Sequence, residues 1–118
     1  MPSGLQDDLE KEFVHAALAR SRFLRQGDAN KSAREYEKLR GITQKIRSLP
    51  DRGEQVFKRI AGSQDAELRI LGAARLLAVD ESFATNILRK IIQGRDQSKA
   101  LEAEMTLKEW HNGLNPEF

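Results

Sequence analysis

Apolar residues recur at spacings of three and four in six stretches of the chain. This spacing places the apolar side chains of each stretch on one face of an α-helix. The stretches are separated by residues that end one helix or cap the next, such as Gly27 with Asp28, Pro50 with Asp51, and Gly94. Residues with β-branched side chains are few and rarely alternate, so no strand is expected. The pattern predicts an all-α protein with about six helices, over residues 5–26, 29–48, a short stretch between 51 and 62, 65–80, 80–93 and 96–112.

The first two predicted helices have well-defined apolar stripes. The stripe of the first is Leu5, Leu9, Phe13, Ala16, Ala17, Phe23 and Leu24, and the stripe of the second is Tyr36, Leu39, Ile42, Ile46 and Leu49. Gly41 interrupts the second helix, where glycine costs about 1 kcal/mol relative to alanine. We therefore expect Gly41 to mark close packing or a bend.

The stretch DAELRILGAARLLAVD, residues 65–80, is apolar on almost every face. So wide an apolar surface is typical of a helix that is covered on more than one side. The small residues around Gly72 would let neighbouring backbones approach closely. We expect Arg69 and Arg75 to leave this helix at an edge and to bond to a loop or a neighbouring helix. Asp65 and Arg69 also have the spacing of an i, i+4 pair.

The predicted connections are short, and short links between helices favour antiparallel neighbours. No segment has the composition of a domain linker, and the length is typical of one domain. We therefore expect a single domain over residues 1–118, with flexible ends at 1–4 and 114–118.

Residues of the fourth and fifth predicted helices resemble a HEAT-type repeat. The first helix of such a repeat carries a turn aspartate, an aliphatic–arginine pair, small residues and late leucines, matched here by Asp65, Glu67, Leu68, Arg69, Ala73, Leu76 and Leu77. The segment DESFATNILRKIIQ is similar to the second helix of the same repeat, and LPDRGEQVFKRIAGSQD to the second helix of a preceding one. Residues 96–110 look like the first helix of an incomplete following repeat, although Glu102 stands where that repeat has arginine. The resemblance implies an α-solenoid, in which helix pairs stack on one another. A generic irregular helical bundle is the alternative.

The chain also resembles, over roughly residues 9–113, a small bacterial family with a HEAT-like fold. This resemblance rests on FVHAALARSRFLRQGDANKSAREYEKL, the central repeat helix and the terminal AEMTLKEWHNG. That family has no established activity, so the resemblance implies a fold and leaves the function open.

The composition narrows the possible chemistry. The chain has no cysteine, which excludes disulfides, thiolate metal sites and a cysteine nucleophile. The beginning MPSGLQDDLEKEF is acidic, unlike a secretion signal, and the nearly uncharged run ILGAARLLAV is about half a membrane span. We expect a soluble cytoplasmic protein that does not bind a membrane.

No motif in the sequence indicates catalysis. His15 and His111 lack a metal-ligand partner at helical spacing, although His15 could pair weakly with Glu12. Carboxylates are dispersed, and there is no nucleophile elbow, P-loop or dinucleotide fingerprint. We therefore predict no enzyme, no catalytic residue, no cofactor and no metal site.

Charge is distributed unevenly. Residues 20–60 carry twelve Lys/Arg against five Asp/Glu, a formal net charge of +7, while the whole chain carries +2. A solvated helix surface with intrahelical pairs such as Glu35–Lys38 would explain this excess. A contact surface for an acidic protein and a phosphate-binding surface for nucleic acid are the two functional interpretations.

The sequence favours a non-enzymatic protein-interaction module. A bacterial regulatory or immunity-type binding protein is one example of such a module. The alternative is a nucleic-acid-binding module that uses the basic surface of residues 20–60. The predicted partner contacts are Arg34, Lys38, Lys45, Arg47 and Trp110. Trp110 shares a helix row with Leu107, which favours a core position, but at the open end of a stack it would be a contact anchor. Leu101 and Met105 flank the same helix, where a second copy of the chain could cover them, so a homodimer is also predicted.

Overall fold

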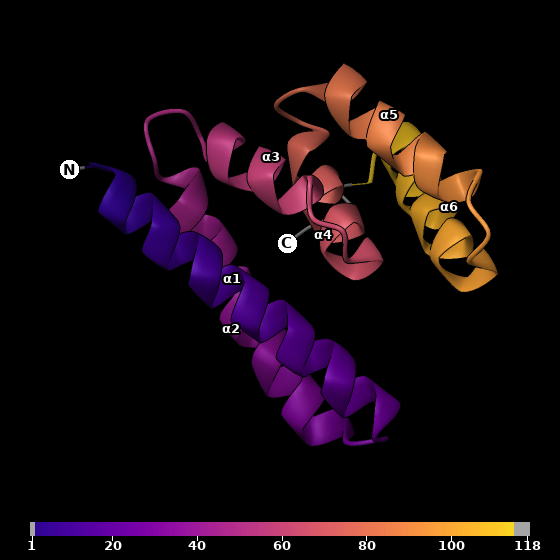
Figure 1. The fold of residues 1–118 in the computed structure, drawn as a ribbon, viewed down its shortest axis with the longest axis horizontal. Helices are drawn as coiled ribbons and strands as arrows, with labels where there is room; N and C mark the ends of the chain where they lie inside the picture. The colour runs from indigo at the N-terminus through magenta and orange to yellow at the C-terminus, as the bar shows by residue number, and fades with distance from the viewer. Residues whose placement is uncertain (1, 115–118) are drawn as a thin grey trace. The chain divides into compact units, whose positions relative to one another are not determined.

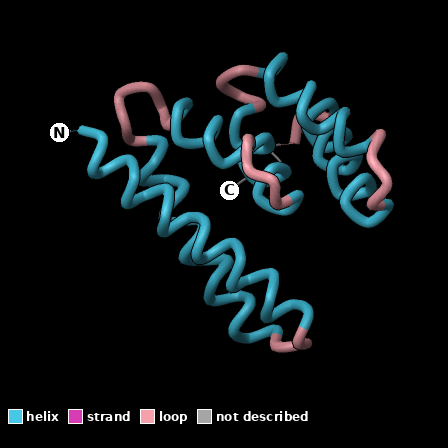
Figure 2. Tube along the Cα trace, viewed as in Figure 1, coloured by secondary structure: helices cyan, strands magenta, loops and turns pink. Residues whose placement is uncertain are grey.

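Six α-helices form the described part of the chain, residues 2–114 of a computed structural model, in which side chains are described from residue 4. The helices are α1 Pro2–Arg25, α2 Ala29–Arg47, α3 Glu54–Ala61, α4 Ala66–Leu76, α5 Glu81–Ile92 and α6 Gln97–His111. No strand occurs among these residues, and short loops join the helices (Figure 2). The all-α prediction and the number of helices are confirmed. Residue 1 and residues 115–118, which belong to the ends expected to be flexible, lie outside the described residues.

Aspartates fix where most of the helices begin. Asp28, Asp65, Asp80 and Asp96 each accept a hydrogen bond from the backbone N–H three residues later, at the start of α2, α4, α5 and α6. Such a bond satisfies one of the N–H groups that a helix start leaves without a partner. Asp51 holds the turn before α3 in the same way, since its carboxylate accepts from the N–H groups of Gly53 at 2.9 Å and Gln55 at 3.2 Å. The predicted starts of α2, α4, α5 and α6 therefore agree closely with the structure, whereas α4 ends at Leu76 and not at residue 80.

Two compact units divide the chain, Met1–Val56 and Phe57–Phe118. In the first unit, α1 and α2 lie side by side along their length (Figure 1). Their contact buries the apolar stripes predicted from the sequence, including Phe13 and Leu39, which are fully buried. The ends of the α1 stripe were predicted wrongly, because Leu5 and Leu24 are 57% and 53% exposed.

In the second unit, α4 packs against α5 and α6, and α5 packs against α6. Gly72 of α4 lies against the backbone of α3, where an added Cβ would be 2.6 Å from the backbone N of Ala61. The predicted close approach at Gly72 is thus confirmed. At Gly41, of the two expectations, close packing is wrong, since nothing lies within 4 Å of a Cβ added there.

Of the two arginines of α4, Arg75 differs from its predicted position. Arg75 is 1% exposed rather than at an edge, and its Nη1 donates to the carbonyl oxygen of Leu71 in its own helix at 3.1 Å. Asp65 caps the helix instead of pairing with Arg69, and no ion pair joins the two in the described part of the chain.

Candidate binding surface

Four basic side chains of α2 share one side of the helix. Lys31, Arg34, Lys38 and Lys45 are exposed and lie within about 60° of one another around the helix axis. They extend over about 20 Å along α2. The buried residues Leu39 and Ile46 lie on the adjacent side, against α1. We call these four residues the basic strip.

The residues of the basic strip differ in their contacts with other side chains. Lys31 lies 3.9 Å from Asp28 and 5.6 Å from the centroid of the Phe23 ring. Arg34 and Lys45 make no side-chain hydrogen bond or ion pair within residues 4–114. Their charges are therefore not engaged by another side chain of the described residues.

Arg47 does not belong to the basic strip. It is half-buried and lies about 160° around the helix from Lys45. Burial, with a further contribution from the positive charge of Arg52, lowers the pKa of its guanidinium from the ordinary value. The structure thus brings Arg34, Lys38 and Lys45 together and separates Arg47 from them.

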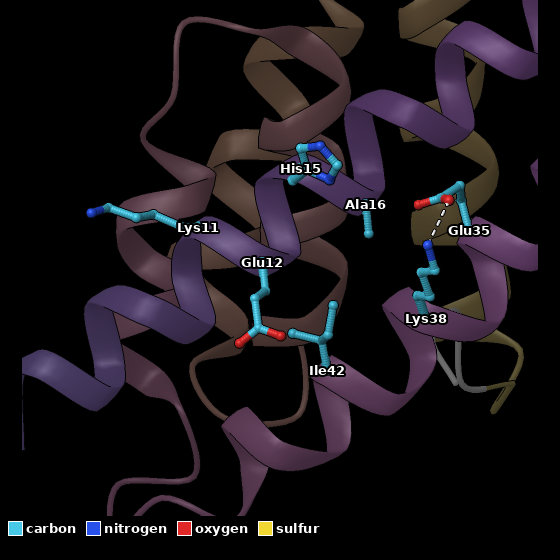
Figure 3. A pocket seen from close by; sticks show the side chains of 7 residues that line it. All are labelled: Lys11, Glu12, His15, Ala16, Glu35, Lys38 and Ile42. Atoms are coloured by element: carbon cyan, nitrogen blue, oxygen red, sulfur yellow. Dashed lines mark hydrogen bonds and ion pairs between the residues drawn. The ribbon is translucent and has the colours of Figure 1, made fainter.

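A groove of about 380 Å³ lies between α1 and α2, beside the basic strip. Its lining residues are Lys11, Glu12, His15 and Ala16 of α1, and Glu35, Lys38 and Ile42 of α2 (Figure 3). Ala16 and Ile42 are buried, and the lining of the groove is mostly apolar. We call this cavity the α1–α2 groove. Lys38 belongs both to the groove and to the basic strip.

Glu35 is the unusual member of the groove. It is only 9% exposed, and its Oε2 accepts a hydrogen bond from Nζ of Lys38 at 3.1 Å. The predicted Glu35–Lys38 pair is confirmed, but on a buried rather than a solvated carboxylate. The other oxygen, Oε1, is buried and has no hydrogen-bond donor among the described residues. Sequence analysis gave no site role to Glu35, yet its position one turn before Leu39 extends the apolar stripe and indicated burial.

The remaining polar groups of the groove are exposed. Glu12 and His15 both line it, but no hydrogen bond joins them, so the weak pairing considered from the sequence is absent. Within the described residues, no three His, Asp or Glu side chains gather as ligands for a metal ion. The groove therefore offers carboxylate acceptors over an apolar floor.

Trp110 lies in the other unit, apart from these residues in the chain. It is half-buried, and its indole Nε1 donates to Oε2 of Glu81 at 2.8 Å, which links α6 to α5. A second, more polar groove of about 320 Å³ includes Glu81, Arg89 and His111 in its lining. Leu101 and Met105 on α6 are 57% and 55% exposed.

Comparison of the chain with protein-family models, curated proteins and solved structures finds no match. None of the helices between residues 2 and 114 combines the length and the apolar character needed to cross a membrane.

Proposed function

We propose that this chain is a non-enzymatic protein-interaction module whose contact surface is formed by the basic strip and the α1–α2 groove. The observation that carries this proposal is the double position of Lys38, which continues the exposed strip and lines the groove. A charged strip beside an apolar groove suits a protein partner, because acidic side chains can meet the strip while one anchor residue enters the groove. The helices of the chain would themselves form a HEAT-like stack of antiparallel helices, which is the fold that the resemblance implies.

A nucleic-acid-binding module remains the second candidate. It is favoured by the exposed, unengaged charges of Arg34 and Lys45, which could contact phosphates. The aromatic residues nearby argue against it, because single-stranded nucleic acids are usually held by stacking on exposed rings. Tyr36 is half-buried with the guanidinium of Arg20 at 5.3 Å from its ring centroid, and the Phe23 ring has Lys31 over it.

The biological setting is proposed by analogy. A small, highly charged helical protein that resembles a bacterial family suits a cytoplasmic regulatory or immunity-type protein that occludes its partner. We propose further that a second copy of the chain covers Leu101 and Met105 of α6, whose exposure supports a contact there.

Affinity capture separates the two candidate functions. The purified chain is used as bait in a lysate of its source cells, with and without nuclease, at low and high salt. A protein retained in a fixed ratio after nuclease treatment at moderate salt supports the interaction module. Recovery of nucleic acid that falls steeply with salt would support phosphate contacts instead.

A further inference from the structure

The α1–α2 groove has two different kinds of surface. Its floor is apolar and includes Ala16 and Ile42, while Glu12 and Glu35 bring carboxylates to it from the two helices. Figure 3 shows the Lys11 side chain pointing away from the other lining residues. Two carboxylates therefore line the groove, and the ammonium group of Lys38 lies against one of them, that of Glu35. This combination suits a ligand with an apolar stem and a cationic head.

Glu35 Oε1 gives this chemistry a specific acceptor. It is a buried carboxylate oxygen that no donor in residues 4–114 reaches. Buried acceptors are nearly always hydrogen-bonded, and one left without a donor is costly. The terminal torsion of a glutamate is broad, so a modest turn of the carboxylate can present Oε1 to the groove. A ligand that brings an N–H group to this oxygen would recover the missing bond.

We infer that the α1–α2 groove binds an arginine side chain of a partner protein. The methylene stem lies on Ala16 and Ile42, and the guanidinium donates to Glu35 Oε1 and to the carboxylate of Glu12. Arginine fits better than lysine because its planar group presents several donors at once and is more weakly hydrated. Acidic residues flanking that arginine meet Arg34 and Lys45 on the basic strip. This inference rests on the proposed protein-binding function and names the chemistry of the partner.

A small probe tests the groove without the natural partner. N-acetyl-arginine amide is titrated into the ¹⁵N-labelled full chain and followed by NMR, with N-acetyl-citrulline amide as an uncharged probe of nearly the same shape. We expect saturable shifts at residues 11–16 and 35–42 with a dissociation constant on the order of millimolar, and binding of citrulline about 10-fold weaker. Absence of saturable shifts in these segments, or equal binding of both probes, would overturn the assignment.

Variants assign the binding to the carboxylates. Glu35→Gln and Glu12→Gln should each weaken binding of the arginine probe about 10-fold, because each replaces a charged acceptor. Glu37→Gln is the matched control, since Glu37 is an exposed carboxylate of α2 that does not line the groove. Glu12 is exposed, so its variant keeps the test valid even if Glu35→Gln perturbs folding. Unchanged binding to Glu12→Gln would contradict the two-carboxylate site.

The probe titration and the affinity capture fail independently. If the probe binds as expected and no protein partner is captured, the interaction module is contradicted and the groove's preference for arginine stands. If a partner is captured and the probe does not bind, the arginine anchor is wrong and the module stands.

Discussion

Nζ of Lys38 lies 3.1 Å from Oε2 of Glu35, one turn earlier on α2. The ammonium group is mostly solvated, with 65% of the Lys38 side chain exposed, whereas 12% of the Glu35 side chain is exposed. The pair therefore stabilises a carboxylate that the contact between α1 and α2 has withdrawn from water. Because Lys38 also continues the basic strip, the strip and the groove share one side chain.

Replacement of Lys38 should destabilise the fold more than replacement of its neighbours on the strip. Lys38→Met leaves the buried carboxylate of Glu35 without its donor, which we expect to lower the free energy of unfolding by about 1 kcal/mol. Lys45→Met removes the same charge at a position where it has no partner, and should change the free energy of unfolding by less than about 0.5 kcal/mol. Urea unfolding followed by circular dichroism measures both, and equal effects would show that the pair contributes nothing.

Two glycine-to-alanine changes should have opposite effects. At Gly72 the new Cβ would lie 2.6 Å from the N and 2.9 Å from the Cα of Ala61, so two backbones must separate. We expect Gly72→Ala to destabilise the protein by about 1–2 kcal/mol, after the gain in helix propensity is included. Gly41→Ala meets open space within α2 and should stabilise by about 1 kcal/mol. Thermal unfolding of both variants decides the matter, and destabilisation by Gly41→Ala would contradict the open environment at that position.

Lys99 should make stability depend on pH in the alkaline range. Burial lowers the pKa of its ammonium group, but Glu67 at 2.8 Å and Glu102 at 3.1 Å outweigh burial and raise the pKa above 10.5. A raised pKa means that the stabilisation is complete below pH 10.5 and is lost as the pH rises through the higher value of the folded state. At pH 8 we expect Lys99→Met to be less stable than the original by about 1 kcal/mol.

The stability difference between the original protein and Lys99→Met should shrink above about pH 10.5, because only the original loses the proton at this site. Urea unfolding at several pH values between about 8 and 12 measures it. A difference that stays constant over this range would show that Lys99 is not coupled to the two glutamates.

Self-association through α6 is tested by sedimentation equilibrium. We expect a dimer at high micromolar concentration, and Met105→Glu should shift it to monomer because a charge enters an apolar contact. Leu18→Glu is the control, since Leu18 is 41% exposed on α1. A monomer for the original protein at these concentrations would remove the dimer.

The helices could be predicted because they depend on residues close together in the sequence. Much of the candidate site could not, because it depends on how the helices pack against one another. Asp28 and Asp96 cap helices because the bond forms within four residues, so sequence alone locates it. The burial of Arg75 could not be foreseen, because it depends on which elements surround α4. Helical spacing alone places Arg34 and Lys45 on one side of α2 and Arg47 on another. The lack of a hydrogen-bond donor at Glu35 Oε1 could not be predicted in this way, because it depends on the position of α1.

The most direct test of the proposed contact surface compares capture by three forms of the chain in a nuclease-treated lysate. These are the original protein, the strip variant Arg34→Gln with Lys45→Gln, and a control with equal charge, Arg40→Gln with Lys90→Gln, at exposed positions outside the basic strip. Recovered proteins are quantified by mass spectrometry. We predict that the original protein and the control retain the same partner and that the strip variant recovers at least about tenfold less of it. Equal recovery by all three forms would contradict the assignment of the basic strip as the contact surface.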